Sequence, residues 1–269
     1  MPYPLIIEAQ ELEKHLEEDD LLIIDLCNGD AYKANHIPGA IHFDYSHIVK
    51  VEKPVMGKVP DDEPLTEIFS SLGITSNTHV VAYDDEGGGK ACRLLWTLEL
   101  CGHQKLSLLN GGIFSWVNKG HPLSHTPAYP TPAHFELNKD VTVLATREYI
   151  QGNLDNDQLQ MLDARSLVEY HGRRNFALKG GHIPGAIHYE WTDAMDKNNN
   201  LCLLPIEDIQ KTLMNKGFDK NSTIVAYCHS HHRSSFSYYI LKAAGFNKVM
   251  GYAGSWSEWG NHPDTPVEN

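Results

Sequence analysis

Residues 224–235 of the chain read Ile-Val-Ala-Tyr-Cys-His-Ser-His-His-Arg-Ser-Ser. The apolar residues that open this stretch suit a buried strand, and a helical pattern runs from Ser234 to Ala244. The serines that end the stretch are suited to capping that helix. A strand, a polar loop and a helix in this order are typical of a parallel sheet covered by helices, so the sequence predicts an α/β fold.

The same pattern occurs twice in the chain. The run 78–84 corresponds to 222–228, and His36–His42 reappears as His182–His188. Two further landmarks recur in the same order, namely strand-like runs that close on Asp25 and Asp163, and Gly- and Trp-containing segments at 111–116 and 254–259. Such a repeat indicates two copies of one folding unit. Asp84 takes in the first copy the place that Cys228 has in the second.

The two copies predict two domains. A chain of 269 residues is long enough for two domains of about 130 residues, each with its own core. The stretch between the copies contains prolines that rule out a continuous helix: Pro122, Pro127, Pro130 and Pro132. We therefore expect a first domain over 1–124, an extended linker over 125–139 and a second domain over 140–269.

Charge and hydropathy exclude several classes of partner. The formal net charge is −13, which disfavours nucleic acids and acidic membrane surfaces, because both select clustered Lys and Arg. Residues 1–10 lack the basic and apolar regions of a secretion signal. No later stretch reaches the about 18 apolar residues that a membrane span needs. We expect a cytoplasmic protein with neither nucleic acid nor membrane as partner.

The cysteines are Cys27, Cys92, Cys101, Cys202 and Cys228. Their odd number and the lack of any Cys-x-x-Cys pair argue against a disulfide framework and against a zinc site. We expect no metal and no cofactor. Only Cys228 has a chemically suggestive setting, and the other four are expected to pack in the core or to be incidentally exposed.

Cys228 lies where a parallel sheet binds ligands. The loop and helix that follow the carboxyl end of a strand present unpaired backbone N–H groups, which hold anions. These groups and the nearby Arg233 should lower the pKa of the thiol, so that the nucleophilic thiolate is available near neutral pH. The same groups would stabilise an anionic persulfide on Cys228.

On these residues the chain resembles the rhodanese family of sulfurtransferases in its tandem-domain form, over nearly its whole length. Tyr32–Phe43 is similar to the family's N-terminal signature, and Val249–Trp259 is similar to its C-terminal Gly-Ser-Trp-x-Glu-Trp signature. The resemblance implies two rhodanese-like domains, each a mainly parallel sheet flanked by helices. It also implies Cys228 as the persulfide carrier, and a first domain that Asp84 leaves catalytically inactive.

The active-site loop that the resemblance implies runs from Cys228 to Arg233 and is similar to that of a bacterial thiosulfate-handling subgroup with a Cys-x-x-His-His-Arg-Ser loop. With Arg233, the residues expected to hold the donor are His229, Ser230, His231 and His232. Partly protonated histidines would attract an anionic donor; alternatively, they only face solvent. Arg165 is expected to bind the donor's anionic end, unless it pairs with Asp163 or Glu169.

The predicted reaction moves a sulfane sulfur from thiosulfate, through the Cys228 persulfide, to cyanide or to a thiol acceptor such as a thioredoxin-like protein. Because the loop differs from those of the best-known family members, 3-mercaptopyruvate stays open as the donor. A Cys-dependent phosphatase is a further alternative, although those enzymes use Cys-x5-Arg and this loop is Cys-x4-Arg. A non-catalytic binding module is another, above all for the first domain.

Overall fold

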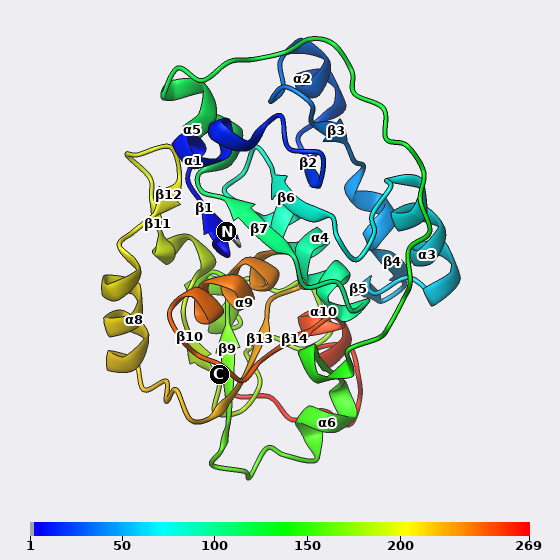
Figure 1. Cartoon of the computed structure of the whole chain (residues 1–269). Coiled ribbons are helices and arrows are strands. Elements are labelled where there is room, and N and C mark those ends of the chain that lie inside the picture. The colour runs from blue at the N-terminus through cyan, green and yellow to red at the C-terminus, as the bar shows by residue number, and fades with distance from the viewer. Residues whose placement is uncertain (1–2) are drawn as a thin grey trace. The chain divides into compact units, whose positions relative to one another are not determined.

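The computed structural model describes residues 3–269, so the first two residues of the predicted domain 1–124 lie outside it. The chain divides into two compact units, each built on one five-stranded sheet (Figure 1). Unit 1 comprises Met1–Ile48, Pro60–Asp140 and Met195–Leu203. Unit 2 comprises Val49–Val59, Val141–Ala194 and Leu204–Asn269. Each unit therefore takes one short segment from the other half of the sequence.

The sheet of unit 1 is parallel throughout and has the strand order β1-β7-β6-β2-β3. Its strands are β1 (Ile6–Ile7), β2 (Leu21–Asp25), β3 (Ile41–His42), β6 (His79–Tyr83) and β7 (Leu106–Leu109). Its helices are α1 (Ala9–Leu12), η1 (Glu13–His15), α2 (Gly29–Ala34), η2 (Tyr45–Ile48), α3 (Asp62–Ser71), α4 (Gly89–Leu100) and α5 (Gly112–Asn118).

The sheet of unit 2 is also parallel, with the strand order β10-β9-β13-β14-β8. Its strands are β8 (Leu144–Ala145), β9 (Leu159–Asp163), β10 (Ile187–His188), β13 (Thr223–Tyr227) and β14 (Val249–Tyr252). Its helices are η3 (Val141–Val143), α6 (Arg147–Gln151), α7 (Leu167–Tyr170), η4 (Trp191–Ala194), α8 (Ile206–Asn215), α9 (Arg233–Ala243) and α10 (Ser255–Trp259). The predicted α/β fold with mainly parallel sheets is confirmed.

The central strand of each unit is buried on both faces, which explains why these strands are continuous apolar runs. Successive side chains of a strand point to opposite faces, so Val225 and Tyr227 of β13 join one core cluster, together with Trp256. The intervening residues of β13 are equally buried, and α9 packs on β13 and β14. Unit 1 repeats this arrangement, with α4 on β6 and β7.

Each unit also contains a two-stranded antiparallel hairpin from the other half of the sequence. The hairpin of β4 (Lys50–Glu52) and β5 (Val55–Lys58) belongs to unit 2. The hairpin of β11 (Met195–Asp196) and β12 (Cys202–Leu203) belongs to unit 1. The hairpin β4–β5 lies against the loop that follows Cys228.

The helix after β13 begins one residue earlier than the sequence pattern suggested. Its N-cap is His232, which makes no side-chain capping hydrogen bond, and Ser234 and Ser235 lie within the first turn. The expectation that these serines cap the helix is therefore wrong. Their hydroxyls are used elsewhere: Ser235 Oγ donates to the carbonyl of His232 (2.6 Å), and Ser234 Oγ contacts His231.

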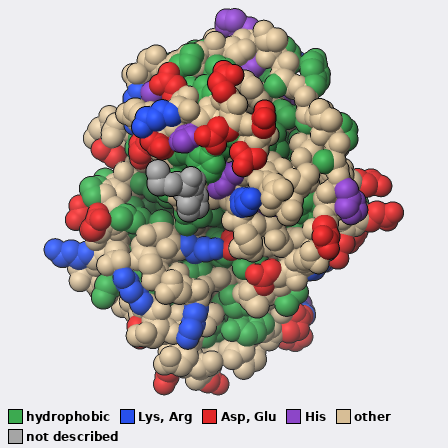
Figure 2. All heavy atoms as spheres, in the orientation of Figure 1, with side chains coloured by type: hydrophobic (Ala, Val, Ile, Leu, Met, Phe, Trp, Pro, Cys, Tyr) green, Lys and Arg blue, Asp and Glu red, His purple; other side chains and the backbone are tan. Residues whose placement is uncertain are grey.

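Acidic side chains outnumber basic ones in the chain, 35 to 22. Figure 2 shows Asp and Glu side chains spread over the face in view, with Lys and Arg interspersed among them, in keeping with the net charge of −13. Among the helices of residues 3–269, none is long and apolar enough to span a membrane.

Candidate active site

Cys228 follows β13 directly, at the carboxyl edge of the parallel sheet of unit 2. Its side chain is only 1% exposed. The loop His229–His232 separates it from α9, which begins at Arg233. The strand–loop–helix order that the sequence predicted is confirmed, and it places the thiol before the N-terminus of a helix, where backbone N–H groups are unpaired.

The loop is held in a tight turn by the start of α10. The backbone N–H groups of Cys228 and His231 both donate to Ser255 Oγ, at 3.3 and 3.1 Å. The Ser255 hydroxyl in turn donates to the carbonyl of Tyr252 at 2.7 Å. His231 and Ser255 have left-handed backbones, with φ of 56° and 50°, a strained conformation for residues other than glycine. The two sequence motifs thus meet, and α10 fixes the shape of the cysteine loop.

The thiol of Cys228 is activated in spite of its burial. Burial by itself raises its pKa, but the charge of Arg233, the Ser234 hydroxyl and the N–H groups of Ser234 and Ser230 outweigh that effect and lower the pKa to about 7. A substantial share of the protein therefore carries the thiolate at neutral pH. Because the loop amides and Arg233 surround the sulfur, a persulfide anion there would meet the same donors.

Ser234 connects Cys228 to a buried histidine. Its hydroxyl donates to the Cys228 sulfur, and His231 Nδ1 lies 2.8 Å from the same hydroxyl oxygen. If Ser234 donates to the sulfur, the Nδ1 of His231 carries the proton that Ser234 Oγ accepts. This role could not be predicted from the sequence, because a serine near the start of a helix ordinarily indicates a cap.

Arg233 is oriented by a carboxylate from another element. Its Nη1 and Nη2 donate to the two carboxylate oxygens of Glu169 at 2.7 and 2.9 Å, a bidentate pair. Burial raises the pKa of Glu169, but the hydrogen bonds and charge of Arg233 prevail and lower it to about 2. Glu169 also accepts from the backbone N–H and hydroxyl of Ser166, which closes a capping box at α7.

This pairing was missed from the sequence, where Glu169 entered only as a possible partner of Arg165. The Ser-x-x-Glu spacing at 166–169 is readable as a capping box. The bond between the Glu169 carboxylate and Arg233 could not be predicted from the sequence, because the two residues lie on different helices that come together only in the folded protein.

The loop histidines point in different directions. His229 meets Phe176 edge-on, with ring centroids 5.8 Å apart, and His232 lies near Trp191, at 6.0 Å. His231 is fully buried against Ser234, so the expectation that the loop histidines face solvent does not hold for it. Burial lowers the pKa of His229, and Arg233 lowers it further. Within the described residues, no group of three His, Cys, Asp or Glu side chains is placed to hold a metal ion.

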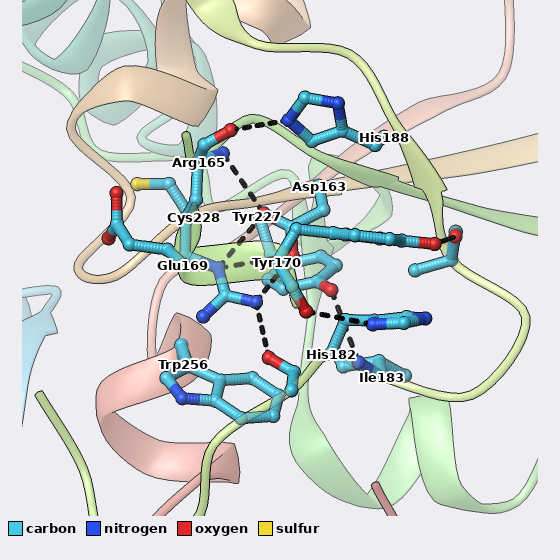
Figure 3. A network of polar contacts seen from close by, with 12 residues as sticks. Asp163, Arg165, Glu169, Tyr170, His182, Ile183, His188, Tyr227, Cys228 and Trp256 are labelled. Atoms are coloured by element: carbon cyan, nitrogen blue, oxygen red, sulfur yellow. Dashed lines mark hydrogen bonds and ion pairs between the residues drawn. The ribbon is translucent and has the colours of Figure 1, made fainter. Parts of the chain in front are cut away.

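Arg165 is committed to structural contacts. Its guanidinium pairs with Asp163, with Nη2 to Oδ2 at 2.6 Å, and donates to the carbonyl of Gly181 at 2.8 Å. It also lies over the indole ring of Trp256, 4.4 Å from the centroid (Figure 3). The side chain is 2% exposed. Of the two readings open from the sequence, the contacts favour pairing with Asp163, so we propose a structural role for Arg165 in place of donor binding.

The hairpin β4–β5 packs against the cysteine loop. The backbone N–H of Met56 donates to Ser257 Oγ at 3.0 Å. A Cβ atom added to Gly57 would lie 2.2 Å from the carbonyl oxygen of Ser230 and 2.7 Å from that of Ala253. Since such contacts are far too short, only glycine permits this approach. The hairpin thus packs against the loop at Ser230. The backbone N–H of Ser230 donates to the Cys228 sulfur.

In unit 1 the corresponding loop holds a carboxylate where unit 2 has the thiol. The carboxylate of Asp84 accepts from the N–H groups of Glu86 (3.0 Å), Gly88 (2.8 Å) and Ala91 (3.0 Å). These amides therefore form an anion cradle that the protein fills with its own side chain. An oxygen anion bound in this way offers no sulfur nucleophile.

Comparison with known proteins identifies the family. Rhodanese-like domains match at residues 8–119 and 146–262. The chain is 42% identical over 265 residues to a thiosulfate sulfurtransferase of Azotobacter vinelandii, covering 98% of this chain and 97% of that protein. It is 40% identical over 265 residues to a thiosulfate sulfurtransferase of Pseudomonas aeruginosa, with the same coverage.

A solved structure shows the same fold. The anaerobic ergothioneine biosynthesis enzyme from Chlorobium limicola, in complex with trimethyl histidine, superposes with a TM-score of 0.87. Its identity to this chain is 23%, over 98% of this chain and 70% of that one, so the likeness concerns the fold alone. Taken with the two matched domains and the relatives similar over nearly the full length, the chain belongs to the rhodanese family.

Proposed function

We propose that the protein transfers the outer sulfur of thiosulfate to cyanide or a thiol through a persulfide on Cys228. The observation that carries this proposal is the setting of Cys228, a buried thiol with a pKa of about 7 that Arg233 and loop amides surround. The two relatives named thiosulfate sulfurtransferase support the choice of donor. No cofactor enters the proposed reaction.

In the first half-reaction, the Cys228 thiolate attacks the outer sulfur of thiosulfate. The new bond joins the two sulfurs, the sulfur–sulfur bond of thiosulfate breaks, and sulfite leaves with the bonding electron pair. The total charge is conserved. Thiolate and thiosulfate together carry −3, and so do the persulfide anion and sulfite that they form. Arg233 and the N–H groups of Ser230 and Ser234 would hold the anionic sulfur throughout.

In the second half-reaction, cyanide or a thiolate attacks the outer sulfur of the persulfide. Its bond to Cys228 breaks, and the cysteine leaves as the thiolate that began the cycle. A low thiol pKa makes Cys228 a good leaving group, so the same donors serve both halves. A thioredoxin-like protein is one thiol acceptor that fits this chemistry.

The contacts of Arg233 argue against the phosphatase alternative. Bidentate phosphate binding through the Nη1–Nη2 edge of Arg233 is not available, because that edge of the guanidinium is bonded to the carboxylate of Glu169. Arg233 then acts mainly through its charge, which suits a single anionic sulfur. The five cysteines are all free, which fits the reducing cytoplasm that we propose as the location.

The test is the intact mass of the purified protein before thiosulfate, after thiosulfate and then after cyanide. We expect a gain of one sulfur atom that cyanide removes, and no gain in Cys228→Ser. A gain with 3-mercaptopyruvate but not with thiosulfate would keep the persulfide and change the donor. No gain with either compound would overturn the proposal and favour a binding module.

A further inference from the structure

One stretch of unit 2 presents apolar and basic side chains to solvent beside the cysteine loop. We call it the acceptor face, and it consists of Leu167, Val168, Arg173, Arg174, Phe176 and Leu178, all exposed. Large apolar side chains that gather within so short a segment usually mark a contact surface. Phe176 is 55% and Leu178 83% exposed.

The acceptor face adjoins the catalytic loop. The ring of Phe176 meets that of His229, the residue after Cys228, at 5.8 Å between centroids. The guanidinium of Arg174 lies over the Phe176 ring at 4.9 Å. The same short helix α7 that exposes Leu167 and Val168 buries Glu169, which holds Arg233. A partner seated on this face would therefore sit next to the sulfur.

The segment is held in a fixed shape. The backbone N–H of Arg174 donates to the carbonyl of Val168 at 3.0 Å. Beyond Leu178, the ammonium group of Lys179 donates to the carbonyls of His262 (2.6 Å) and Thr265 (2.7 Å). Docking on a rigid segment costs little ordering entropy, which suits transient contact with a partner.

The charge of this face differs from that of the rest of the molecule. The exposed residues of 167–178 include two arginines and no carboxylate, since Glu169 is buried, whereas the whole chain carries −13. Within residues 3–269, neither the Arg173 nor the Arg174 guanidinium forms an ion pair. An acidic partner would be repelled by most of the surface and attracted here, which orients it toward Cys228.

We propose that the acceptor face docks an acidic protein that presents a cysteine thiol, the acceptor of the Cys228 sulfur. This inference rests on the proposed function. The partner's thiolate attacks the outer sulfur of the persulfide, forms a new sulfur–sulfur bond and releases Cys228 as thiolate, so charge and electrons balance without an oxidant. Because Cys228 is 1% exposed, the thiol must be presented at close range, and the face provides the seat.

The experiment starts from full-length protein whose persulfide has been verified by mass. Sulfur transfer is timed to two short peptides, each with one cysteine, flanked by aspartates in one and by serines in the other. We expect transfer to the acidic peptide to be about tenfold faster at low salt, an advantage that falls as salt is added. Flanking aspartates raise the pKa of a peptide thiol, so each rate is divided by the thiolate fraction of that peptide at the same pH, and the ratio of the corrected rates then isolates docking.

The test variant is Arg173→Glu/Arg174→Glu, which touches neither Cys228 nor its donors. We expect it to lose the preference for the acidic peptide while its rate with the neutral peptide stays within about twofold of wild type. The matched control, Lys211→Glu/Lys216→Glu, makes the same charge change on and just after α8. It should keep the preference.

Three results would overturn the inference while leaving the persulfide mechanism intact. The first is equal transfer to both peptides by the wild type. The second is an equal loss with both peptides in the arginine variant, which would indicate damage to the site. The third is a wild-type dimer that the arginine variant converts to a monomer, because the face would then bind a second copy of this chain. Failure of the persulfide to form would instead refute the proposed function.

Discussion

At the scale of single residues, the low pKa of Cys228 comes from specific donors that act against burial. Cys92 in α4 is buried as completely, and its pKa is raised well above the ordinary value by burial and then by Asp84. The pKa of Cys228 instead falls to about 7, because Arg233, Ser234 and the loop amides outweigh the same burial effect. The sign of the shift is therefore set by what surrounds the sulfur.

Ser234 provides a direct test of this account. Removing its hydroxyl in Ser234→Ala takes one donor from the thiolate, so the pKa of Cys228 should rise by about half to one unit. Persulfide formation needs the thiolate, so its rate increases with pH through about 7 in the wild type, and the midpoint should move upward in the variant.

The matched control is Ser235→Ala, in the same helical turn, whose hydroxyl donates to the carbonyl of His232. Thiolate absorbance and single-turnover persulfide formation, both followed against pH, give the two midpoints. An unchanged midpoint in Ser234→Ala, or an equal shift in both variants, would contradict the proposed role of the hydroxyl.

Arg165 makes a second prediction at this scale. Arg165→Met leaves Asp163 buried without its partner, and the loss of a buried pair's partner costs about 3–5 kcal/mol. Adding Asp163→Asn removes the stranded charge and should restore most of the free energy of unfolding, measured by denaturant titration. In the double variant, KM for thiosulfate should stay near the wild-type value. A large rise in KM in a stable double variant would restore Arg165 as a donor-binding residue.

At the scale of elements, the sequence predicted what depends on local pattern and missed what depends on distant pairing. The run 223–227 is apolar because β13 is buried on both faces, so both the strand and the position of Cys228 after it were readable. Helix α9 was placed within one residue. The pairing of Glu169 with Arg233 joins elements 64 residues apart, and no local periodicity encodes it.

The hairpin β4–β5 is the clearest element that was not predicted from the sequence. Nothing in residues 49–59 indicates that they pack on the loop after β13, since a short hairpin can bury its residues against either sheet. A glycine within a strand can indicate that another backbone approaches closely, and Gly57 is such a residue. The sequence does not show that the approaching backbone is that of Ser230, and only the folded structure does.

Gly57→Ala tests whether the hairpin positions the loop. The added methyl group would overlap the carbonyl of Ser230, so either the hairpin or the loop must move. We expect kcat/KM for thiosulfate to fall about 10- to 100-fold and the pKa of Cys228 to rise, because Ser230 donates to the sulfur. Val51→Ala, at an exposed position of the same hairpin, should leave both unchanged. Wild-type kinetics in a folded Gly57→Ala variant would show that the hairpin does not set the loop.

At the scale of the whole molecule, the two units share one design but differ in the charge around the anion cradle. In unit 2 the thiol of Cys228 has Arg233 as its neighbour, and that arginine is oriented by Glu169. In unit 1 the same strand end carries Asp84, and the charge of Glu86 raises the pKa of that carboxyl in addition to burial. The nearby Lys90 is bonded to Asp85 and contributes little free positive charge.

This difference predicts that a cysteine alone does not make unit 1 catalytic. In Asp84→Cys combined with Cys228→Ser, the new thiol would have the amide cradle but would feel the charge of Glu86, which already acts on Asp84, with Asp85 next to it in the chain. Those charges raise the thiol pKa and repel the thiosulfate dianion. We expect no sulfur gain by intact mass under conditions that fully load the wild type.

Adding Asp85→Ser and Glu86→Ser removes the repulsion and should permit slow, partial loading. Full loading of the variant without these serines would show that the amides suffice and that the charge of Arg233 is dispensable.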